Sequence, residues 1–198
     1  MSLKFSYSLI APFYDALIQS ASATVRQKSL QHLPAEGSLD VFINGIGTGL
    51  DIPYLHPQHR YVGLDLTAAM LKHAATRISE RQISLVQGTS LALPFSDHSF
   101  DHAILHLILA VVPDPLACLQ ETARIIKPGG SILILDKFLR PGQHAWIRRA
   151  LSPISAQIAT RMDVVFEDAL IQVPQLKLIA DEPALMGGWF RMIRLIKI

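Results

Sequence analysis

The sequence predicts an α/β fold in which helices cover both faces of a mostly parallel sheet. Apolar runs with strand character alternate with segments of helical periodicity between about residues 38 and 138. A glycine-rich turn follows the first of these runs, and the end of the chain reads as two strands joined by a turn. Such alternation is typical of parallel sheets, because a parallel strand pair needs a crossover connection that is usually helical.

The bulk composition fits a single globular domain. The chain has 198 residues, of which 50% are hydrophobic, and a formal net charge of +2. This weak charge gives no reason to expect nucleic-acid binding, which usually shows as a concentrated basic patch. Cys118 is the single cysteine, so no internal disulfide forms and a cytoplasmic location is expected. We expect neither a signal peptide nor a membrane-spanning helix.

Five strands are expected in the first part of the chain. They lie at residues 38–44, 60–66, 83–88, 100–108 and 131–138. A short helix that accepts Pro53 in its first turn follows the first strand. Thr67 is the expected N-cap of a helix over 68–81, with Met70 and Ile78 on its apolar face.

One more helix is expected before the fifth strand. Asp114 and Pro115 open it, it runs to Ile126, and the sequence KPGG (127–130) ends it. The single domain then divides into four parts by residue pattern. They are N-terminal lid helices (1–33), a cofactor-binding core (38–138), a helical insertion on the substrate side (139–170) and a terminal strand pair (171–198).

The glycine turn is the first feature that points to a ligand. Gly45, Gly47 and Gly49 follow the first strand, and glycines let a backbone turn tightly and a ligand approach closely. In an open parallel sheet, ligands bind beyond the carboxyl ends of the strands. Asp65 ends the second predicted strand, where a carboxylate can accept hydrogen bonds from ribose hydroxyls. Turn and acid together predict an adenosine-containing ligand.

The spacing of the glycines separates two classes of cofactor. The dinucleotide fingerprint is G-x-G-x-x-G, which places a pyrophosphate against a helix N-terminus. Here the spacing is G-x-G-x-G, and no second phosphate-binding feature lies nearby. S-adenosylmethionine has no phosphate, so a shorter and tighter turn is sufficient for it.

Five motifs between Val41 and Phe138 resemble those of the class I S-adenosylmethionine-dependent methyltransferases. They are GIGTGLDIPYL, YVGLDLTAAMLKHA, LVQGTSLALPFSDHSFD, VVPDP and ETARIIKPGGSILILD. The upstream YSLIAPFYD (7–15) resembles the lid helix of the ubiquinone/menaquinone methyltransferase-like branch. The segment FLRPGQHAWIRRALSPISAQIATR and the ending GGWFRMIRLIK are most similar to small bacterial phosphatidylethanolamine N-methyltransferases.

The resemblance implies a Rossmann-like sheet of seven strands whose last strand is antiparallel. It also implies that S-adenosyl-L-methionine is the cofactor, with roles for matching positions. The three glycines would border the methionine and ribose portions, and Asp65 would bind the ribose hydroxyls. Leu66 and Met70 would pack near the adenine.

Two positions depart from the family pattern. The family usually has an acid where Ile43 stands, at the cofactor's amino end, and another where Thr89 stands, at the adenine. Thr89 or Ser90 is expected to accept the adenine hydrogen bond, and Asn44 to replace part of the hydrogen bonding in the loop. A charge-assisted bond is worth about 1.5–3 kcal/mol. The double departure therefore leaves a non-catalytic cofactor-binding or scaffolding protein as one alternative.

Methyl transfer needs alignment more than it needs a catalytic group. If a base takes part, His106 is the first candidate, because it falls at the carboxyl end of the fourth strand, on the cofactor side. The same histidine could instead be a hydrogen-bonded structural residue. Tyr14 is the candidate that reaches the substrate or cofactor from the lid. His98, His102 and His106 recur every four residues, but on a strand this spacing makes no metal site, so no metal is expected.

The predicted insertion is basic and amphipathic, which bears on the methyl acceptor. It carries Trp146, Arg148, Arg149 and Arg161, and such a face binds anionic membranes or phospholipid headgroups. Most amphipathic helices instead pack on their own domain, which is the alternative interpretation. With the resemblance, the basic insertion favours a phospholipid amine such as phosphatidylethanolamine as acceptor, and peripheral contact with a membrane. A small molecule such as a quinone precursor is the alternative, and no feature fixes an oligomeric state.

Overall fold

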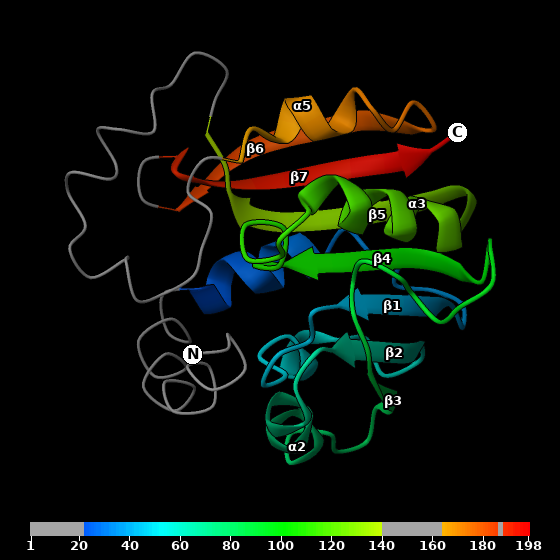
Figure 1. Ribbon diagram of the computed structural model, residues 1–198. Helices are drawn as coiled ribbons and strands as arrows, with labels where there is room; N and C mark the ends of the chain where they lie inside the picture. Colours follow the sequence, from blue (N-terminus) through cyan, green and yellow to red (C-terminus); the bar gives the residue numbers. More distant parts are fainter. Residues whose placement is uncertain (1–21, 140–163, 186–187) are drawn as a thin grey trace.

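Seven strands form a single sheet in the order β3-β2-β1-β4-β5-β7-β6 (Figure 1). The protein is represented by a computed structural model, which describes residues 22–139, 164–185 and 188–198. The strands are β1 (Asp40–Asn44), β2 (Arg60–Asp65), β3 (Gln82–Gln87), β4 (Phe100–His106), β5 (Ile126–Lys137), β6 (Leu176–Leu185) and β7 (Phe190–Lys197). The described helices are residues 22–30, η1 (Ile52–Tyr54), α2 (Ala68–Ala75), α3 (Pro115–Ile125) and α5 (Phe166–Leu170).

The strand directions confirm the predicted sheet. β1 pairs in parallel with β2 and β4, and further parallel pairs join β2 to β3 and β4 to β5. β7 is antiparallel to both β5 and β6. The chain fills the sheet outward from β1 in one direction and then from β4 in the other, so the strand order reverses between β1 and β4. A ligand crevice is expected at the carboxyl ends of these two strands.

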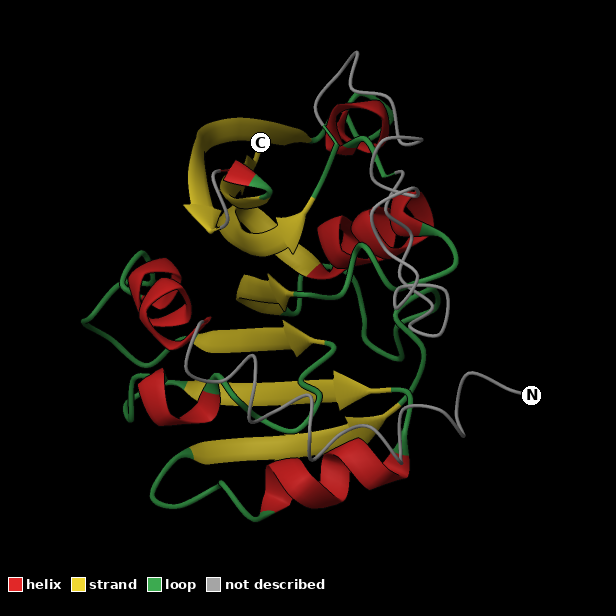
Figure 2. Ribbon diagram, turned by 90° about the vertical axis from the view of Figure 1, so that its left-hand side faces the viewer, coloured by secondary structure: helices red, strands yellow, loops and turns green. Residues whose placement is uncertain are grey.

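Each face of the sheet has its own apolar core, and helices cover both faces (Figure 2). Alternate residues of β1 point to opposite faces, as strand geometry requires. Phe42 packs in the cluster that includes α3 and α5, whereas Ile43 packs in the cluster that includes Leu30, Ile52 and Ala74. Helix 22–30 thus covers the same face as η1 and α2. No helix among the described residues is long and apolar enough to cross a membrane.

Several predicted boundaries were wrong. The helix expected over 68–81 ends at Ala75, because the Thr76 hydroxyl donates 2.7 Å to the His73 carbonyl and closes the last turn. β4 ends at His106 because Leu107 takes the left-handed φ of 62°. The KPGG sequence (127–130) belongs to β5 rather than to a loop. α3 ends at Ile125, and β5 begins at the next residue, Ile126.

Two predicted helical regions fall largely outside the described residues. Of the lid helices predicted over 1–33, residues 22–30 are helical and residues 1–21 are not described. Of the helical insertion predicted over 139–170, residues 140–163 are not described, and α5 (Phe166–Leu170) lies in its last part.

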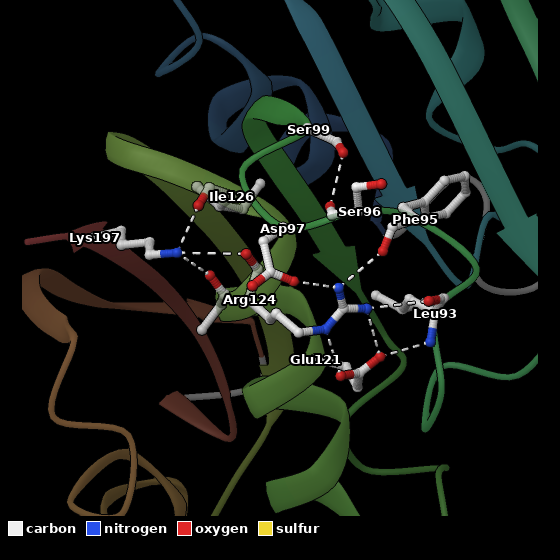
Figure 3. A network of polar contacts seen from close by, with 10 residues as sticks. Leu93, Phe95, Ser96, Asp97, Ser99, Glu121, Arg124, Ile126 and Lys197 are labelled. Atoms are coloured by element: carbon white, nitrogen blue, oxygen red, sulfur yellow. Dashed lines mark hydrogen bonds and ion pairs between the residues drawn. The ribbon is translucent and has the colours of Figure 1, made fainter.

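A group of polar contacts around Lys197 and Arg124, here called the polar clamp, lies at the end of the sheet opposite the carboxyl ends of β1 and β4 (Figure 3). The Lys197 Nζ donates to the carbonyl oxygens of Ala123 and Ile126, both at 2.7 Å, at the point where α3 passes into β5. Beside it, Arg124 binds Glu121 and Asp97, each at 2.8 Å. The last strand is therefore tied to the end of α3, and α3 to the loop before β4.

Candidate cofactor site

The glycine turn lies at the carboxyl end of β1, and β2 holds it in place. The backbone N–H groups of Gly45 and Ile46 both donate 2.9 Å to the Leu64 carbonyl. The N–H of Gly47 donates 3.0 Å to the Asp65 carboxylate. Two neighbouring strand ends therefore share one hydrogen-bonded loop.

All three glycines have positive φ, which side chains rarely adopt: 71° at Gly45, 56° at Gly47 and 83° at Gly49. They differ in what surrounds them. A Cβ added at Gly45 would lie 2.7 Å from Cδ1 of Ile108, and one at Gly49 would lie 2.6 Å from Cδ1 of Ile52. A Cβ at Gly47 would meet no heavy atom within 4 Å. Gly45 and Gly49 are needed for packing, whereas Gly47 borders open space.

Asp65 organises the β2 side of the turn. Its Oδ2 accepts the Gly47 N–H, and its Oδ1 accepts the N–H of Thr67 at 2.9 Å and the hydroxyl of Thr67 at 2.8 Å. The carboxylate is only partly buried, and each oxygen has two lone pairs, so Oδ2 can also accept a ribose hydroxyl. Leu66 beside it is 50% exposed, and Met70 is half-buried one turn into α2. An apolar surface therefore lies next to an acid that is suited to accept hydrogen bonds from a diol.

The side chain of Asn44 lies in the protein interior and not on the open side of the glycine turn. Its side chain is fully buried, and its amide nitrogen donates 3.1 Å to the hydroxyl of Thr122 on α3. Its amide oxygen accepts a 2.5 Å bond from the hydroxyl of Ser90, in the loop after β3. Thr89 is exposed, and its hydroxyl accepts the N–H of Leu91 at 3.2 Å. Any role of the Asn44 side chain in cofactor binding therefore passes through the Ser90 loop.

His106 has contacts at both ring nitrogens. Nδ1 lies 2.8 Å from Oδ1 of Asp51, and Nε2 lies 3.0 Å from the hydroxyl of Ser29 on helix 22–30. Arg26 of the same helix binds the same Asp51 oxygen through Nη1 at 2.8 Å. The histidine is thus at the predicted place, the end of β4, but in a buried network. It remains a candidate base, and proton transfer to an acceptor would require one of these bonds to open.

Sequence reasoning missed Asp51. Burial would raise the pKa of its carboxyl, but the charge of Arg26 and the contacts with Arg26 and His106 outweigh burial and hold the pKa well below its usual range. The carboxylate is therefore ionised at neutral pH. The one signal available was an acid directly after a glycine turn, at a position that becomes fully enclosed.

The loop after β4 was also missed. Leu107 has a φ of 62°, unusual for a leucine, and Ile108 packs against Gly45. Asp136, at the end of β5, fixes this loop by accepting the N–H of Ala110 at 3.0 Å. Burial raises the pKa of Asp136 to about 6, although hydrogen bonds from Ala110 and Lys137 oppose the rise. The ends of three strands, β1, β4 and β5, thus contribute to one rim of packed and hydrogen-bonded loops.

The remaining predicted sites add little to the described part. Tyr14 lies in residues 1–21, outside the described residues. His102 contacts the Ser131 hydroxyl at 2.7 Å, and His98 lies in the turn before β4. Within the described ranges, no three His, Cys, Asp or Glu side chains gather as a metal site.

The residues at the carboxyl ends of β1 and β2 fit an adenosine cofactor that carries an amino-acid end. The Asp65 carboxylate can accept hydrogen bonds from a diol, and Leu66 offers an apolar surface. Gly47 borders open space, into which a side chain at this position would extend. No cluster of basic side chains or second anion-binding turn accompanies them among the contacts described at the turn. S-adenosylmethionine therefore fits these residues better than a dinucleotide.

Comparison with known proteins agrees with this geometry. Residues 39–134 match the family model of a methyltransferase domain. Over 186 residues the chain is 27% identical to the phosphatidylethanolamine N-methyltransferase of Cereibacter sphaeroides, an alignment that covers 91% of each protein. The predicted resemblance to the class I S-adenosylmethionine-dependent methyltransferases is thereby confirmed.

Other relatives of this methyltransferase act on different molecules. It is 31% identical over 139 residues to the ubiquinone/menaquinone biosynthesis C-methyltransferase of Syntrophotalea carbinolica, which covers 66% of this chain and 59% of that protein. Among solved structures, geranyl diphosphate C-methyltransferase from Streptomyces coelicolor, in complex with S-adenosyl-L-homocysteine, matches with a TM-score of 0.71 at 16% identity. That match covers 90% of this chain and 76% of the other, and it shows a shared fold.

These comparisons confirm the predicted enzyme class, cofactor and fold. The methyltransferase uses S-adenosylmethionine, and the non-catalytic alternative raised by Ile43 and Thr89 gains no support from them. The assignment of single residues to the cofactor stays a prediction that rests on the geometry above.

Proposed function

We propose that this methyltransferase transfers a methyl group to the amine of a phospholipid headgroup, such as phosphatidylethanolamine. The observation that carries the proposal is the extent of the alignment with phosphatidylethanolamine N-methyltransferase, which spans 91% of both chains. The alignment with the quinone C-methyltransferase covers a smaller share of each chain, 66% and 59%. A match outside the cofactor-binding core is the more informative part, since that core is common to many acceptors.

The reaction is a displacement at carbon. The cofactor supplies an electrophilic methyl group on its sulfonium sulfur. The lone pair of the acceptor nitrogen forms the new C–N bond, the C–S bond breaks, and S-adenosylhomocysteine leaves. The nitrogen loses a proton to water or to a base when it started as a primary or secondary amine. The protein contributes by holding the two reactants in line, for which the closely packed rim around Gly45 and Ile108 is suited.

Access to a lipid acceptor requires peripheral contact with a membrane surface. The basic and aromatic residues that favour such contact are in the predicted insertion: Trp146, Arg148, Arg149 and Arg161. They lie outside the described residues, so their sequence alone supports this part of the proposal. The expected consequence is binding to anionic vesicles that weakens as the salt concentration rises.

The experiment follows a labelled methyl group. The purified protein is incubated with methyl-labelled S-adenosylmethionine and either phosphatidylethanolamine vesicles or a demethylated quinol. Label in the chloroform-soluble amine lipid supports the proposal. Label in the quinol supports the second candidate, a quinone-precursor methyltransferase, which the 31% identity to the quinone enzyme favours. Asp65→Ala is the control that should lose transfer to any acceptor.

A further inference from the structure

A buried ion pair lies next to the glycine turn without an obvious role in the fold. Arg26 Nη1 and Asp51 Oδ1 are 2.8 Å apart, and the two side chains are 7% and 4% exposed. Asp51 comes two residues after Gly49, and Arg26 belongs to helix 22–30. Because His106 also contacts Oδ1, the pair lies beside both the turn and the carboxyl end of β4.

The position of the pair matches one end of an extended cofactor. β1 lies between β2 and β4 in the sheet. Asp65 at the end of β2 is the group suited to the ribose, on one side of the turn. A cofactor that places its ribose there extends its remaining part across β1 toward the end of β4, where Asp51 and His106 lie. The part that remains is the amino-acid portion.

The charges of the pair are complementary to that portion. An α-amino acid carries a carboxylate and an ammonium group, and the pair offers a guanidinium and a carboxylate. Arg26 uses Nη1 for Asp51 and Nε for the Ser22 hydroxyl at 3.1 Å, and both described contacts of Asp51 use Oδ1. A guanidinium has five N–H donors and a carboxylate about four lone-pair sites, so each side chain can bind a further group.

Stability alone is a weak reason for such a pair. Removing two charges from water costs several kcal/mol per ion by order of magnitude, and apolar replacements of buried pairs are often neutral or stabilising. The same face of the sheet is otherwise apolar here, with Ile43 and Ile52 buried within its cluster. β1 therefore offers no carboxylate on the face that helix 22–30 covers, and Asp51 is the carboxylate that lies there.

We propose that the Arg26–Asp51 pair binds the amino-acid end of S-adenosylmethionine. Arg26 recognises the α-carboxylate and Asp51 the α-ammonium group, and His106 and Ser22 hold the pair in position. The proposal does not depend on which acceptor is methylated, since it concerns the cofactor alone.

Calorimetry with three ligands distinguishes the proposed role of Arg26, which is to bind the α-carboxylate, from that of Asp51, which is to bind the α-ammonium group. S-adenosylhomocysteine carries both charged groups, decarboxylated S-adenosylmethionine lacks the α-carboxylate, and 5′-methylthioadenosine lacks the whole amino-acid portion. Each is titrated into the wild-type protein, Arg26→Gln and Asp51→Asn. Arg191→Gln is the matched control, because it removes another buried arginine that pairs with an aspartate, Asp181, away from the turn.

The proposal makes a different forecast for each ligand. Arg26→Gln should lower the affinity for S-adenosylhomocysteine by about 10- to 100-fold, the worth of a charge-assisted bond. It should change the affinity for the other two ligands by less than about threefold. Asp51→Asn should lower the affinity for the two ligands that carry the ammonium group and leave the affinity for 5′-methylthioadenosine unchanged. Arg191→Gln should change none of the three affinities.

The proposal is overturned if either variant lowers the affinity for all three ligands equally, or if neither variant lowers the affinity for S-adenosylhomocysteine. Either result would mean that the pair only clamps helix 22–30 to the sheet. A single variant leaves one buried charge without its partner, so folding is checked by circular dichroism. The double variant Arg26→Gln/Asp51→Asn leaves no such charge. It should fold and should bind S-adenosylhomocysteine and 5′-methylthioadenosine with nearly equal affinity, and a retained preference for the former also overturns the proposal.

Discussion

The Ser90 hydroxyl donates a 2.5 Å hydrogen bond to the amide oxygen of Asn44, which joins the loop after β3 to the end of β1. Both side chains are buried. The amide nitrogen of the same Asn44 reaches Thr122 on α3 at 3.1 Å. One buried side chain thus holds together three segments, the end of β1, α3 and the loop that carries the predicted adenine contacts Thr89 and Ser90.

Replacing Asn44 by leucine should therefore destabilise the fold. The substitution keeps the branching of the side chain and its number of heavy atoms, but it leaves the Ser90 hydroxyl buried without its acceptor. We expect the free energy of unfolding to fall by about 2–3 kcal/mol, measured by urea denaturation. The double variant Asn44→Leu/Ser90→Ala should recover part of this loss, because both partners are then apolar. Fully additive losses in the double variant would contradict the coupling.

The glycines of the turn should respond differently to alanine. Gly49→Ala places a Cβ 2.6 Å from Cδ1 of Ile52 and 3.1 Å from the backbone Cα of Ala74, so the protein should lose most of its stability. Gly47→Ala meets no atom within 4 Å and should cost about 1–2 kcal/mol for its left-handed φ. Its methyl group enters the proposed cofactor space, so S-adenosylhomocysteine affinity should fall by about tenfold or more. Wild-type affinity in a folded Gly47→Ala protein would mean that the open space is not the cofactor side.

Asp136 should make stability decrease as the pH rises. Burial raises the pKa of this carboxyl to about 6 in the folded protein, from an ordinary 3.8. Between these values the folded state keeps a proton that the unfolded state releases, so the free energy of unfolding falls by up to about 3 kcal/mol from pH ~4 to pH ~7.

Asp136→Asn removes this titration. The free energy of unfolding in urea is measured for both proteins across that pH range. The difference between the two proteins should follow the titration of a single group. Carboxylates with a lowered pKa, such as Asp51, act in both proteins and lose their stabilising effect at lower pH, so they do not contribute to the difference. A constant difference would show that Asp136 is ionised throughout.

Much of the fold was predictable because buried parallel strands read as apolar runs. The runs placed the first five strands in order, and the turn residues separated the last two. The errors came where contacts remote in sequence decide the outcome. β4 stops at His106 because Leu107 turns, which no local pattern indicates. KPGG reads as a loop, yet Gly130 lies in β5 so close to the Asp101 carbonyl that no Cβ fits.

The site was predictable only where local spacing carries it. Three glycines and an acid after the next strand located the turn and Asp65. Asn44 faces away from Ile43, as the alternation of side chains along a strand requires. Asp51 escaped because an acid after a glycine turn is unremarkable in sequence. Its partner Arg26 lies 25 positions earlier, and such a pairing leaves no periodic signal.

The clamp at Lys197 offers a test of stability that is separate from the cofactor site (Figure 3). Its Nζ is the partner of the Ala123 and Ile126 carbonyls at the end of α3, and burial lowers the pKa of its ammonium group. Lys197→Met has a similar length but no donor, so these carbonyls lose a charged partner inside the protein. We expect a loss of about 2–4 kcal/mol in the free energy of unfolding, measured in urea, at unchanged affinity for S-adenosylhomocysteine. Lys177→Met, at an exposed position on the adjacent edge strand, should change neither quantity. Equal losses in the two variants would show that charge at this end of the sheet matters, and not the cap on α3.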